Sequence, residues 1–219
     1  MIRYLTARQL DHYPDLRHAM HLDRTAQFRD RLKWEVSVDE AGLERDEYDA
    51  LDPLYVVWEP APGVHGGSMR FLPMDGRTMV DDHFGALMSR RIDDPRVWEC
   101  TRFCLAPKAS PQVAGLLMLA GGELMRGFGL THLLGVFDAR MIRIYKAIGA
   151  EPEVLGGSGE GRDRIHVGLW PFRPLDRLGV LRRAGVSSDI SELWFRRAFG
   201  ADPAMDFAAP ARRPRDAAA

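Results

Sequence analysis

Residues 97–137 read VWECTRFCLAPKASPQVAGLLMLAGGELMRGFGLTHLLGVF, and this stretch decides the fold of the chain. Residues 97–106 are typical of a strand, and the apolar run 113–128 is typical of a largely buried helix that begins near Pro111. Residues 133–137 predict a second strand. We expect these two strands to lie next to each other in one sheet and to splay apart. A slot of that kind suits a long, thin ligand.

The elements on either side of this unit predict a mixed sheet with helices on both faces. Upstream, residues 16–32 have loose helical periodicity after Pro14, residues 34–38 alternate like a short strand, and residues 54–58 and 64–72 form an antiparallel hairpin. Downstream we expect a helix at 139–148, a flexible loop at 156–161, a strand at 164–170, and two short helices at 175–184 and 190–199. The predicted fold class is therefore α/β.

Composition limits what kind of protein this is. The chain has 219 residues, 46% of them hydrophobic and 28% charged, and its formal net charge is −1. These values indicate one globular domain, which we place at residues 1–202, and they give no general attraction to nucleic acid or to an anionic membrane. We expect no signal peptide and no membrane span, hence a cytoplasmic protein. The Ala-, Pro- and Arg-rich residues 203–219 predict a disordered tail.

Ten spaced residues in the N-terminal half form a set that an ordinary core would not need. Seven are charged, and several of these lie beside apolar, strand-like runs. Charges next to buried strands are costly unless they pair, so the set predicts a polar pocket. Its members are Arg24, Phe28, Trp34, Glu44, Asp46, Asp49, Arg70, Phe84, Glu99 and Arg102.

Three parts of this set each allow two interpretations. The acidic run 44–49 is either a solvated loop or a pocket wall in which Asp49 makes a bidentate contact with Arg70. Arg24 and Phe28, one helical turn apart, are either core plus surface charge or part of a binding site. Glu99 lies inside a strand and is either a structural ion-pair member or a base with a raised pKa.

Alternation along the strand 97–106 places Arg102 on the opposite face from Glu99 and Thr101, unless a bulge re-aims one of them. Bulges of this kind concentrate near active sites.

Taken together, these residues resemble the signature of the LuxI-type acyl-homoserine lactone synthases, the enzymes that make bacterial quorum-sensing signals (autoinducers). The resemblance rests on Gly42-Leu43-Glu44-x-Asp46-x-Tyr48-Asp49, on Gly67-Ser68-x-Arg70-x-Leu72-Pro73 and on Trp98-Glu99-x-Thr101-Arg102-Phe103. One departure is Thr101, where serine is common in the family, and the hydroxyl is kept.

The resemblance implies a fold similar to the GNAT acetyltransferases: a single-domain, three-layer α-β-α sandwich with a mixed central sheet splayed into an acyl-binding cleft. It also implies the reaction. The amine of S-adenosylmethionine (SAM) attacks the thioester of an acyl chain carried on acyl carrier protein or on coenzyme A, and lactonisation then releases methylthioadenosine. SAM is thus a substrate, and neither a cofactor nor a metal is expected.

The resemblance also implies roles for individual residues. The expected catalytic residues are Glu99 as base, with Asp46, Arg70, Asp49 and Arg102. The expected SAM-binding residues are Arg24, Phe28, Trp34, Asp46 and Arg102, while Glu44 fixes its loop and Phe84 packs behind the wall. The expected acyl pocket is formed by Phe103, Met118, Leu134, Gly135 and Phe137. Acyl carrier protein is acidic, so the expected docking patch is Arg140, Arg143 and Lys146 on one helix.

Some synthases have a threonine where this chain has Gly135, and it binds a 3-oxo group. Glycine here therefore predicts an acyl chain that is unsubstituted at C3.

Two other functions remain open from the sequence. One is a GNAT-like N-acyltransferase that uses acyl-CoA and a different amine. The other is a non-catalytic regulator that binds SAM or an acyl group. The N-acyltransferase would not need the dense set of carboxylates and arginines.

Overall fold

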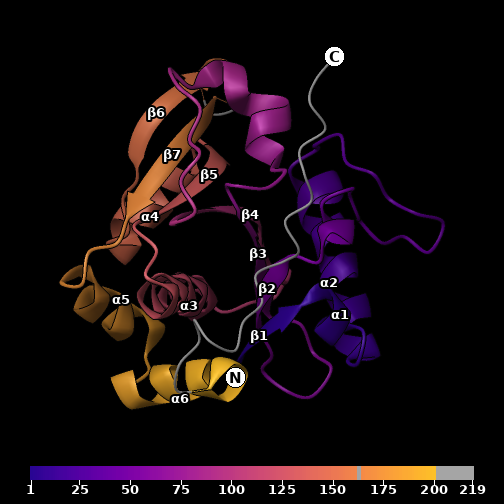
Figure 1. The fold of residues 1–219 in the computed structure, drawn as a ribbon. Coiled ribbons are helices and arrows are strands. Elements are labelled where there is room, and N and C mark those ends of the chain that lie inside the picture. The colour runs from indigo at the N-terminus through magenta and orange to yellow at the C-terminus, as the bar shows by residue number, and fades with distance from the viewer. Residues whose placement is uncertain (162–163, 201–219) are drawn as a thin grey trace.

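The chain folds around one open seven-stranded sheet with strand order β1-β2-β3-β4-β5-β7-β6 (Figure 1). The structure is a computed structural model and describes residues 1–161 and 164–200. The tail predicted at 203–219 lies outside the described residues. All neighbouring strands are antiparallel except β4 and β5, which are parallel, so the sheet is mixed as predicted.

The strands are β1 (Ile2–Thr6), β2 (Leu54–Trp58), β3 (Gly67–Pro73), β4 (Val97–Leu105), β5 (His132–Asp138), β6 (Glu153–Ser158) and β7 (Ile165–Pro171). The α-helices are α1 (Ala7–Leu10), α2 (Pro14–Thr25), α3 (Gln112–Phe128), α4 (Met141–Ile148), α5 (Asp176–Ala184) and α6 (Ser188–Phe199). Short helical turns of other types are η1 (Ala26–Arg31), η2 (Asp49–Leu51), η3 (Val80–Phe84) and η4 (Gly85–Leu87). None of the described helices combines the length and apolar character needed to cross a membrane.

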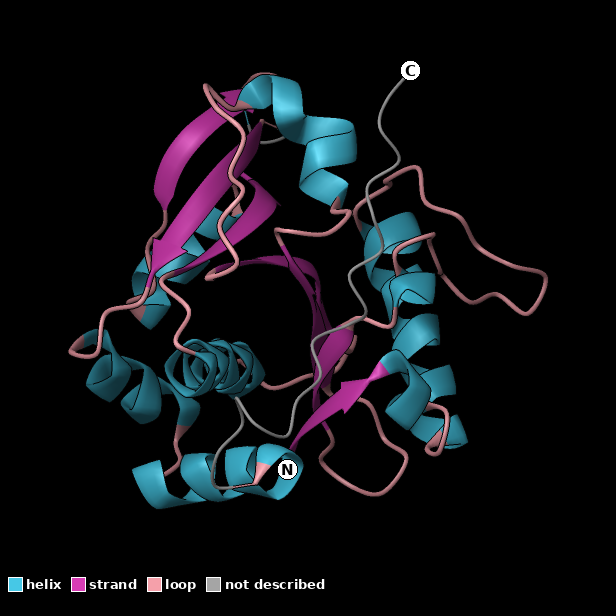
Figure 2. Cartoon of the chain, in the orientation of Figure 1, coloured by secondary structure: helices cyan, strands magenta, loops and turns pink. Residues whose placement is uncertain are grey.

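Helices cover both faces of the sheet, which confirms the three-layer α-β-α arrangement. The larger apolar cluster joins the strands to α3, α5 and α6 on one face. On the other face, α1 and α2 pack on residues of β1 and β2 such as Leu5 and Val57. A third cluster lies under η3 and η4 and includes Val80, Val97 and Leu134. Figures 1 and 2 show α3 and α2 on opposite sides of the strands.

The sheet opens between β4 and β5, as the sequence predicts. Their parallel pairing covers only three positions and ends where Glu99 lies beside Leu134. Beyond this point β4 continues along β3, while β5 continues along β7, so the two halves of the sheet diverge (Figure 2).

A bulge in β4 reverses the alternation of its side chains. Ser68 pairs with Cys104 and Arg70 pairs with Thr101, so two residues of β4, Arg102 and Phe103, lie opposite one residue of β3. Arg102 has φ +52°, in the left-handed region that non-glycine residues rarely adopt. Thr101 and Arg102 therefore both face α2 and the acidic loop, and simple alternation gave the wrong face for Arg102.

Two expectations for the N-terminal half were wrong. Residues 2–6 form β1, which was not predicted, and β1 covers the outer edge of β2. Residues 34–38 form no strand and make only the isolated bridge between Val38 and Glu44. Because β1 already pairs with β2 there, residues 34–38 find no strand to pair with at that edge.

The predicted loop at 156–161 is also partly wrong, because residues up to Ser158 belong to β6. Gly156 sits at an irregularity in the β6–β7 pairing. A Cβ atom at Gly156 would come within 1.8 Å of the carbonyl oxygen of Leu87, so the glycine permits η4 to lie directly on the strand. Sequence alone marks such a glycine as a loop signal, which explains the error.

A buried carboxylate, Glu123 on α3, ties the C-terminal helices to the core. Its side chain is fully buried, and it accepts hydrogen bonds from Arg177 of α5 at 2.6 and 3.0 Å and from Ser191 of α6 at 2.9 Å. Arg126, one turn along α3, pairs with the other carboxylate oxygen at 2.8 Å. A single charge thus joins three helices.

We predict that Glu123→Ala lowers the free energy of unfolding by about 3 kcal/mol, because the largely buried Arg177 loses its carboxylate partner at 2.6 Å and keeps the more distant Glu192, at 3.4 Å. Chemical denaturation measures this change. Glu40→Ala, at an exposed loop position, serves as the matched control and should stay within about 0.5 kcal/mol of wild type. A loss no larger than that of the control would show that Glu123 does not hold the helices.

Candidate active site

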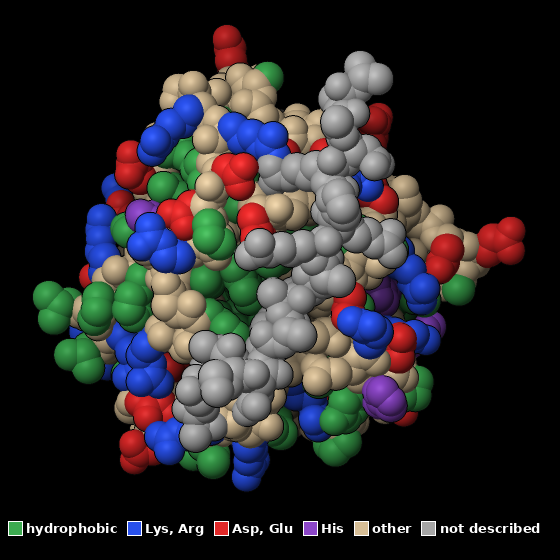
Figure 3. All heavy atoms as spheres, viewed as in Figure 1, with side chains coloured by type: hydrophobic (Ala, Val, Ile, Leu, Met, Phe, Trp, Pro, Cys, Tyr) green, Lys and Arg blue, Asp and Glu red, His purple; other side chains and the backbone are tan. Residues whose placement is uncertain are grey.

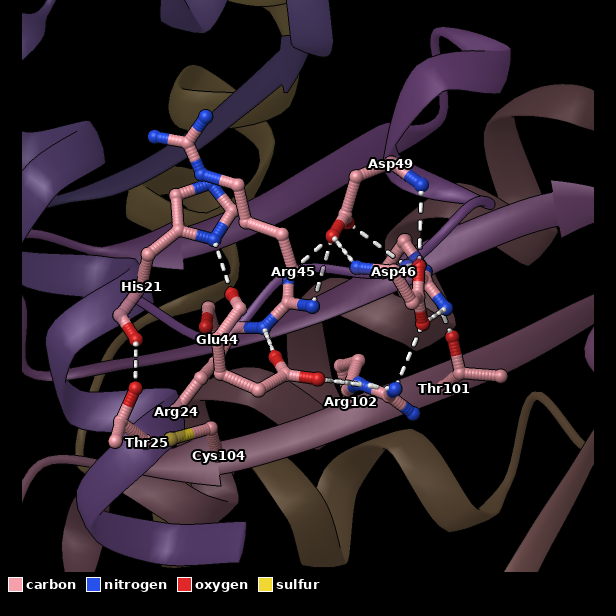
Figure 4. A network of polar contacts seen from close by, with 12 residues as sticks. His21, Arg24, Thr25, Glu44, Arg45, Asp46, Asp49, Thr101, Arg102 and Cys104 are labelled. Carbon is pink, nitrogen blue, oxygen red and sulfur yellow. Dashed lines mark hydrogen bonds and ion pairs between the residues drawn. The ribbon is translucent and has the colours of Figure 1, made fainter. Parts of the chain in front are cut away.

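Six charged side chains from four parts of the chain form a closed ring in which arginines and carboxylates alternate (Figure 4). Each carboxylate bridges two arginines: Glu44 joins Arg24 to Arg102, Asp46 joins Arg102 to Arg70, and Asp49 joins Arg70 to Arg24. The three positive charges balance the three negative ones. Burial of so many charges is tolerable only because every member is paired.

The ring corrects one predicted contact. Asp49 does contact Arg70, through a single hydrogen bond of 2.8 Å from Nη1. The bidentate partner of Arg70 is instead Asp46, and the bidentate partner of Asp49 is Arg24, at 3.0 and 2.9 Å. Thr101 also accepts a hydrogen bond from Arg70, at 3.0 Å. Glu44, Asp46 and Asp49 are therefore paired within the protein and are not solvated, whereas Glu47 in the same run is half exposed.

The arginines differ in their access to a ligand. The side chain of Arg24 is only 1% exposed, and all three of its guanidinium nitrogens donate to Glu44 or Asp49. Arg70 is also fully buried, whereas Arg102 is 13% exposed. Arg102 is thus the better placed of the two arginines predicted to hold a substrate carboxylate, because Arg24 is already occupied.

Two carboxylates of the ring, Asp46 and Asp49, are held in their charged form. Burial alone would raise the pKa of Asp46, but the charge and hydrogen bonds of Arg70, with the charge of Arg102, outweigh it and lower that pKa. For Asp49 the same balance, dominated by Arg24 and Arg70, holds its pKa far below the ordinary range. Both groups are therefore anionic at neutral pH.

Glu99 has the opposite character. Its side chain is fully buried, and its carboxylate accepts hydrogen bonds from the backbone N–H groups of Val80, at 2.6 Å, and Met79, at 3.1 Å. Burial raises the pKa of Glu99 to about 7, although these N–H groups and the charge of Arg70 act against the rise. A carboxyl group with such a pKa can take up and release protons near neutral pH.

The predicted aromatic pair lies beside the ring. Phe28 is buried, and its ring stacks on Trp34 with centroids 5.4 Å apart and an angle of 7° between the planes. The guanidinium of Arg102 lies 5.5 Å from the centre of the Phe28 ring. Trp34 is 39% exposed, so one part of this aromatic surface remains accessible. Phe84, as expected, packs behind the site, against the cluster around Val80.

A cavity adjoins the ring where β4 and β5 separate. Its volume is about 140 Å³, and Thr101 and Arg102 border it together with a mainly apolar wall. Hydrophobic side chains are visible in the hollow between α3 and the β5–β7 strands (Figure 3). The wall includes Met69, Cys100, Phe103, Met118, Leu119, Met125, Leu133, Gly135, Val136, Tyr145, Trp170, Phe172 and Val180.

Two residues predicted for the acyl pocket do not line this cavity. Leu134 is fully buried on the other face of β5, in the cluster with Val97, because successive strand residues alternate and Leu133 takes the cavity side. Phe137 shares the face of Leu133 but lies behind the wall, in ring contact with Tyr145 at 5.3 Å. Phe103, Met118 and Gly135 do line the cavity.

The predicted basic patch lies on and just before α4. Arg140, Arg143 and Lys146 are all exposed. Arg140 pairs with Asp138 at 2.9 Å, so its charge is partly offset. Arg143 and Lys146 therefore carry most of the positive charge of this surface.

Several groups that hold the site together were not predicted from the sequence. The Tyr55 hydroxyl donates to Asp49 at 2.5 Å, and the Tyr48 hydroxyl donates to Asp82 at 2.8 Å. Met79 acts through its backbone on Glu99 and through its sulfur on Arg102, at 3.6 Å. Tyrosines are common in strands and loops. The only signal in the sequence that these two belong to the site is their closeness to the acidic run 44–49. Within the described ranges 1–161 and 164–200, no cluster of His, Cys, Asp and Glu side chains could hold a metal ion.

Comparison with known proteins agrees with this arrangement. A family model described as autoinducer synthase matches residues 9–173. An acyl-homoserine-lactone synthase of Rhizobium etli is 39% identical over 178 residues, which cover 78% of this chain and 84% of the relative. A second one, from Agrobacterium fabrum, is 32% identical over 166 residues, 68% of this chain and 78% of the relative.

Solved structures show the same fold. MesI, a CoA-dependent acyl-homoserine lactone synthase, matches with a TM-score of 0.73 at 21% identity, covering 86% of this chain and 97% of its own. BjaI, another CoA-dependent synthase, solved with SAM and isopentyl-CoA, also has a TM-score of 0.73 at 21% identity, covering 86% and 90%. A putative N-acetyltransferase from Lactobacillus plantarum has a TM-score of 0.53, at 18% identity and covering 79% and 98%, which relates the fold to that of acetyltransferases. The chain belongs to the autoinducer synthase family and is an acyltransferase of the acyl-homoserine-lactone synthase kind.

Proposed function

We propose that the protein makes an acyl-homoserine lactone by joining an acyl chain to SAM at the junction of the charged ring and the apolar cavity. The observation that carries this proposal is the position of Arg102 and Asp46. They are adjacent in the ring, they are among its partly exposed members, and Arg102 also borders the cavity. A zwitterionic amino acid and an acyl thioester can therefore meet at one point.

The exposed edge of the ring fits the amino-acid end of SAM. Arg102 can bind the substrate carboxylate through its planar guanidinium, and Asp46, whose pKa is lowered and which is ionised at neutral pH, can hold the α-ammonium group. Phe28 and Trp34 lie beside Arg102 and offer aromatic faces to the sulfonium and adenosine part. Asp49, Arg70, Arg24 and Glu44 complete the ring and keep these two groups in place.

The chemistry needs one proton to leave before the first bond forms, because an ammonium group is not a nucleophile. Glu99, with a pKa near 7, is the base, acting directly or through a water molecule. The free amine attacks the thioester carbonyl carbon, the amide forms and the thiol leaves. The methionine carboxylate then attacks its own γ-carbon, and the sulfonium leaves as methylthioadenosine.

The acyl chain lies in the apolar cavity, and its donor approaches from outside it. The donor is acyl carrier protein or acyl-CoA. The exposed charges of Arg143 and Lys146 support an acidic carrier protein, since opposite charges steer and orient such a partner. MesI and BjaI are CoA-dependent, which keeps acyl-CoA as the alternative donor. That the chain is unsubstituted at C3, inferred from Gly135, stays a prediction.

The aromatic pair yields the first test. We predict that Trp34→Ala raises KM for SAM about ten-fold, because an aromatic face for a cation is lost, while stability changes little at this exposed position. Trp34→Phe should keep most of the affinity. Leu22→Ala, at a residue that is 46% exposed, is the control and should leave KM unchanged. An unchanged KM in Trp34→Ala would remove Trp34 from the SAM site.

The second test concerns the base. In wild type, kcat/KM should fall as the pH drops below about 7, because protonation of Glu99 removes the base. Glu99→Gln should lower kcat at least 100-fold, as expected for loss of a general base, and change the Kd of SAM less than about three-fold. Methylthioadenosine release and calorimetric SAM binding measure the two effects. Turnover like that of wild type in Glu99→Gln would exclude Glu99 as the base.

The third test separates the two donors. The double charge reversal Arg143→Glu with Lys146→Glu should raise KM for an acyl carrier protein donor at least ten-fold and leave KM for the same acyl-CoA nearly unchanged. Reversal of Arg196 and Arg197, exposed on α6, is the matched control. Equal effects of the two double variants on the carrier-protein donor would contradict a docking role for α4.

A further inference from the structure

The cavity is small for an acyl pocket. An apolar cavity of about 150 Å³ in a well-studied lysozyme variant holds one benzene molecule. The cavity here has a volume of about 140 Å³, so it matches an acyl tail of about six carbons rather than a long fatty chain. Residues of α3, β4, β5 and β7 line the cavity. The indole of Trp170, on β7, forms part of its wall.

Trp170 is fixed in its position from several sides. Its indole N–H donates to the carbonyl oxygen of Ala150 at 2.8 Å. The ring of Tyr145 meets it edge-on, with centroids 5.0 Å apart, and the ring of Phe137 meets it at 5.5 Å. A side chain with a hydrogen bond and two aromatic neighbours loses these contacts if it swings away, so it forms a rigid wall.

The glycine at position 135 makes room for this wall. Trp170 lies opposite Leu133 in the β5–β7 pairing, and its indole leans over Gly135. A Cβ atom at Gly135 would stand 3.3 Å from a ring carbon of Trp170 and 2.9 Å from the carbonyl oxygen of Cys100. Even the smallest side chain would thus press on both the indole and β4. The indole therefore fills the space into which a side chain at position 135 would project.

Other directions are unsuitable for a longer chain. The part of the cavity near α5 is bordered by Glu151, Arg173, Asp176 and Arg177. Arg177 is hydrogen-bonded to the buried Glu123. Methylene groups packed against these charged side chains would desolvate them, which is unfavourable. The neighbours of Trp170 are, by contrast, the aromatic rings of Phe137 and Tyr145, so the space that a smaller side chain at position 170 would vacate is bounded by apolar groups.

We propose that Trp170, seated over Gly135, is the residue that sets acyl length and restricts this synthase to short chains of about six carbons. This inference rests on the proposed function, because it requires the cavity to hold the acyl group of the donor. Trp170 is then the specificity-determining residue, and the substrate class is short saturated acyl thioesters.

The experiment compares wild type, Trp170→Ala and Trp170→Phe on saturated acyl thioesters from butanoyl to tetradecanoyl. Methylthioadenosine release gives kcat/KM for each length, and mass spectrometry identifies each lactone. Wild type should be best near hexanoyl and lose about ten-fold or more in kcat/KM with each further pair of carbons. Trp170→Ala should move the optimum to a longer chain and lower kcat/KM for hexanoyl. Trp170→Phe, which is smaller and lacks the N–H bonded to Ala150, should fall between them.

Trp194→Ala is the matched control, since Trp194 packs on the same apolar cluster but away from the cavity. It should keep the length profile of wild type even if it lowers stability. A wild-type optimum at decanoyl or longer overturns the inference, and so does an unchanged profile in both Trp170 variants. If Trp170→Ala does not fold, the profile of Trp170→Phe decides. Absence of lactone from wild type with every donor would instead refute the proposed function.

Discussion

The alternating ring of three arginines and three carboxylates is the constraint on which the rest of the site depends. Its members come from α2, the acidic segment 44–49, β3 and β4, so the ring closes only when these four parts of the chain are correctly assembled. Because each charge has two partners of opposite sign, loss of one member leaves two buried charges underpaired. Such losses cost about 3–5 kcal/mol. The ring therefore serves as a rigid support for the SAM site that we propose at its partly exposed edge.

The bulge at Arg102 links this ring to the fold. A regular β4 would point Arg102 into the apolar face with Trp98 and Cys100, where a charge has no partner. The extra residue turns Arg102 to the face of Thr101, where it closes the ring through Glu44 and Asp46. A non-glycine residue at positive φ costs about 1–3 kcal/mol, and the two ion pairs offset that cost. The same bulge lies just beyond the last pairing of β4 with β5, so the ring and the cavity share one border.

Sequence patterns predicted the elements that depend on local periodicity. They failed for features that depend on pairing with segments distant in the chain. The strand–helix–strand unit at 97–137, the hairpin and the opening between β4 and β5 follow from apolar runs and turn residues. The strand β1 was missed and residues 34–38 were misassigned, because which segment pairs with β2 is decided in three dimensions. The ring members could be named from their spacing, but the bidentate partners of Asp46 and Asp49 could not. Alternation also could not distinguish the cavity-facing Leu133 from Leu134, since the strand's orientation is set by its packing.

The position of Glu99 defines how a proton must travel. Its carboxylate is fully buried and is not part of the cavity wall, so a proton from an ammonium group held at Asp46, as we propose, reaches it through a water molecule or through movement of the residues between them. Met79 spans the distance between them: its N–H binds Glu99, and its sulfur contacts Arg102. Movement of this one residue would change the solvation of Glu99 and the position of Arg102 together. Burial raises the pKa of Glu99 to about 7, while the arginines of the ring lower the pKa of Asp46 and Asp49 and keep both ionised. The protein thus holds acidic groups with opposite protonation behaviour in one region of the fold.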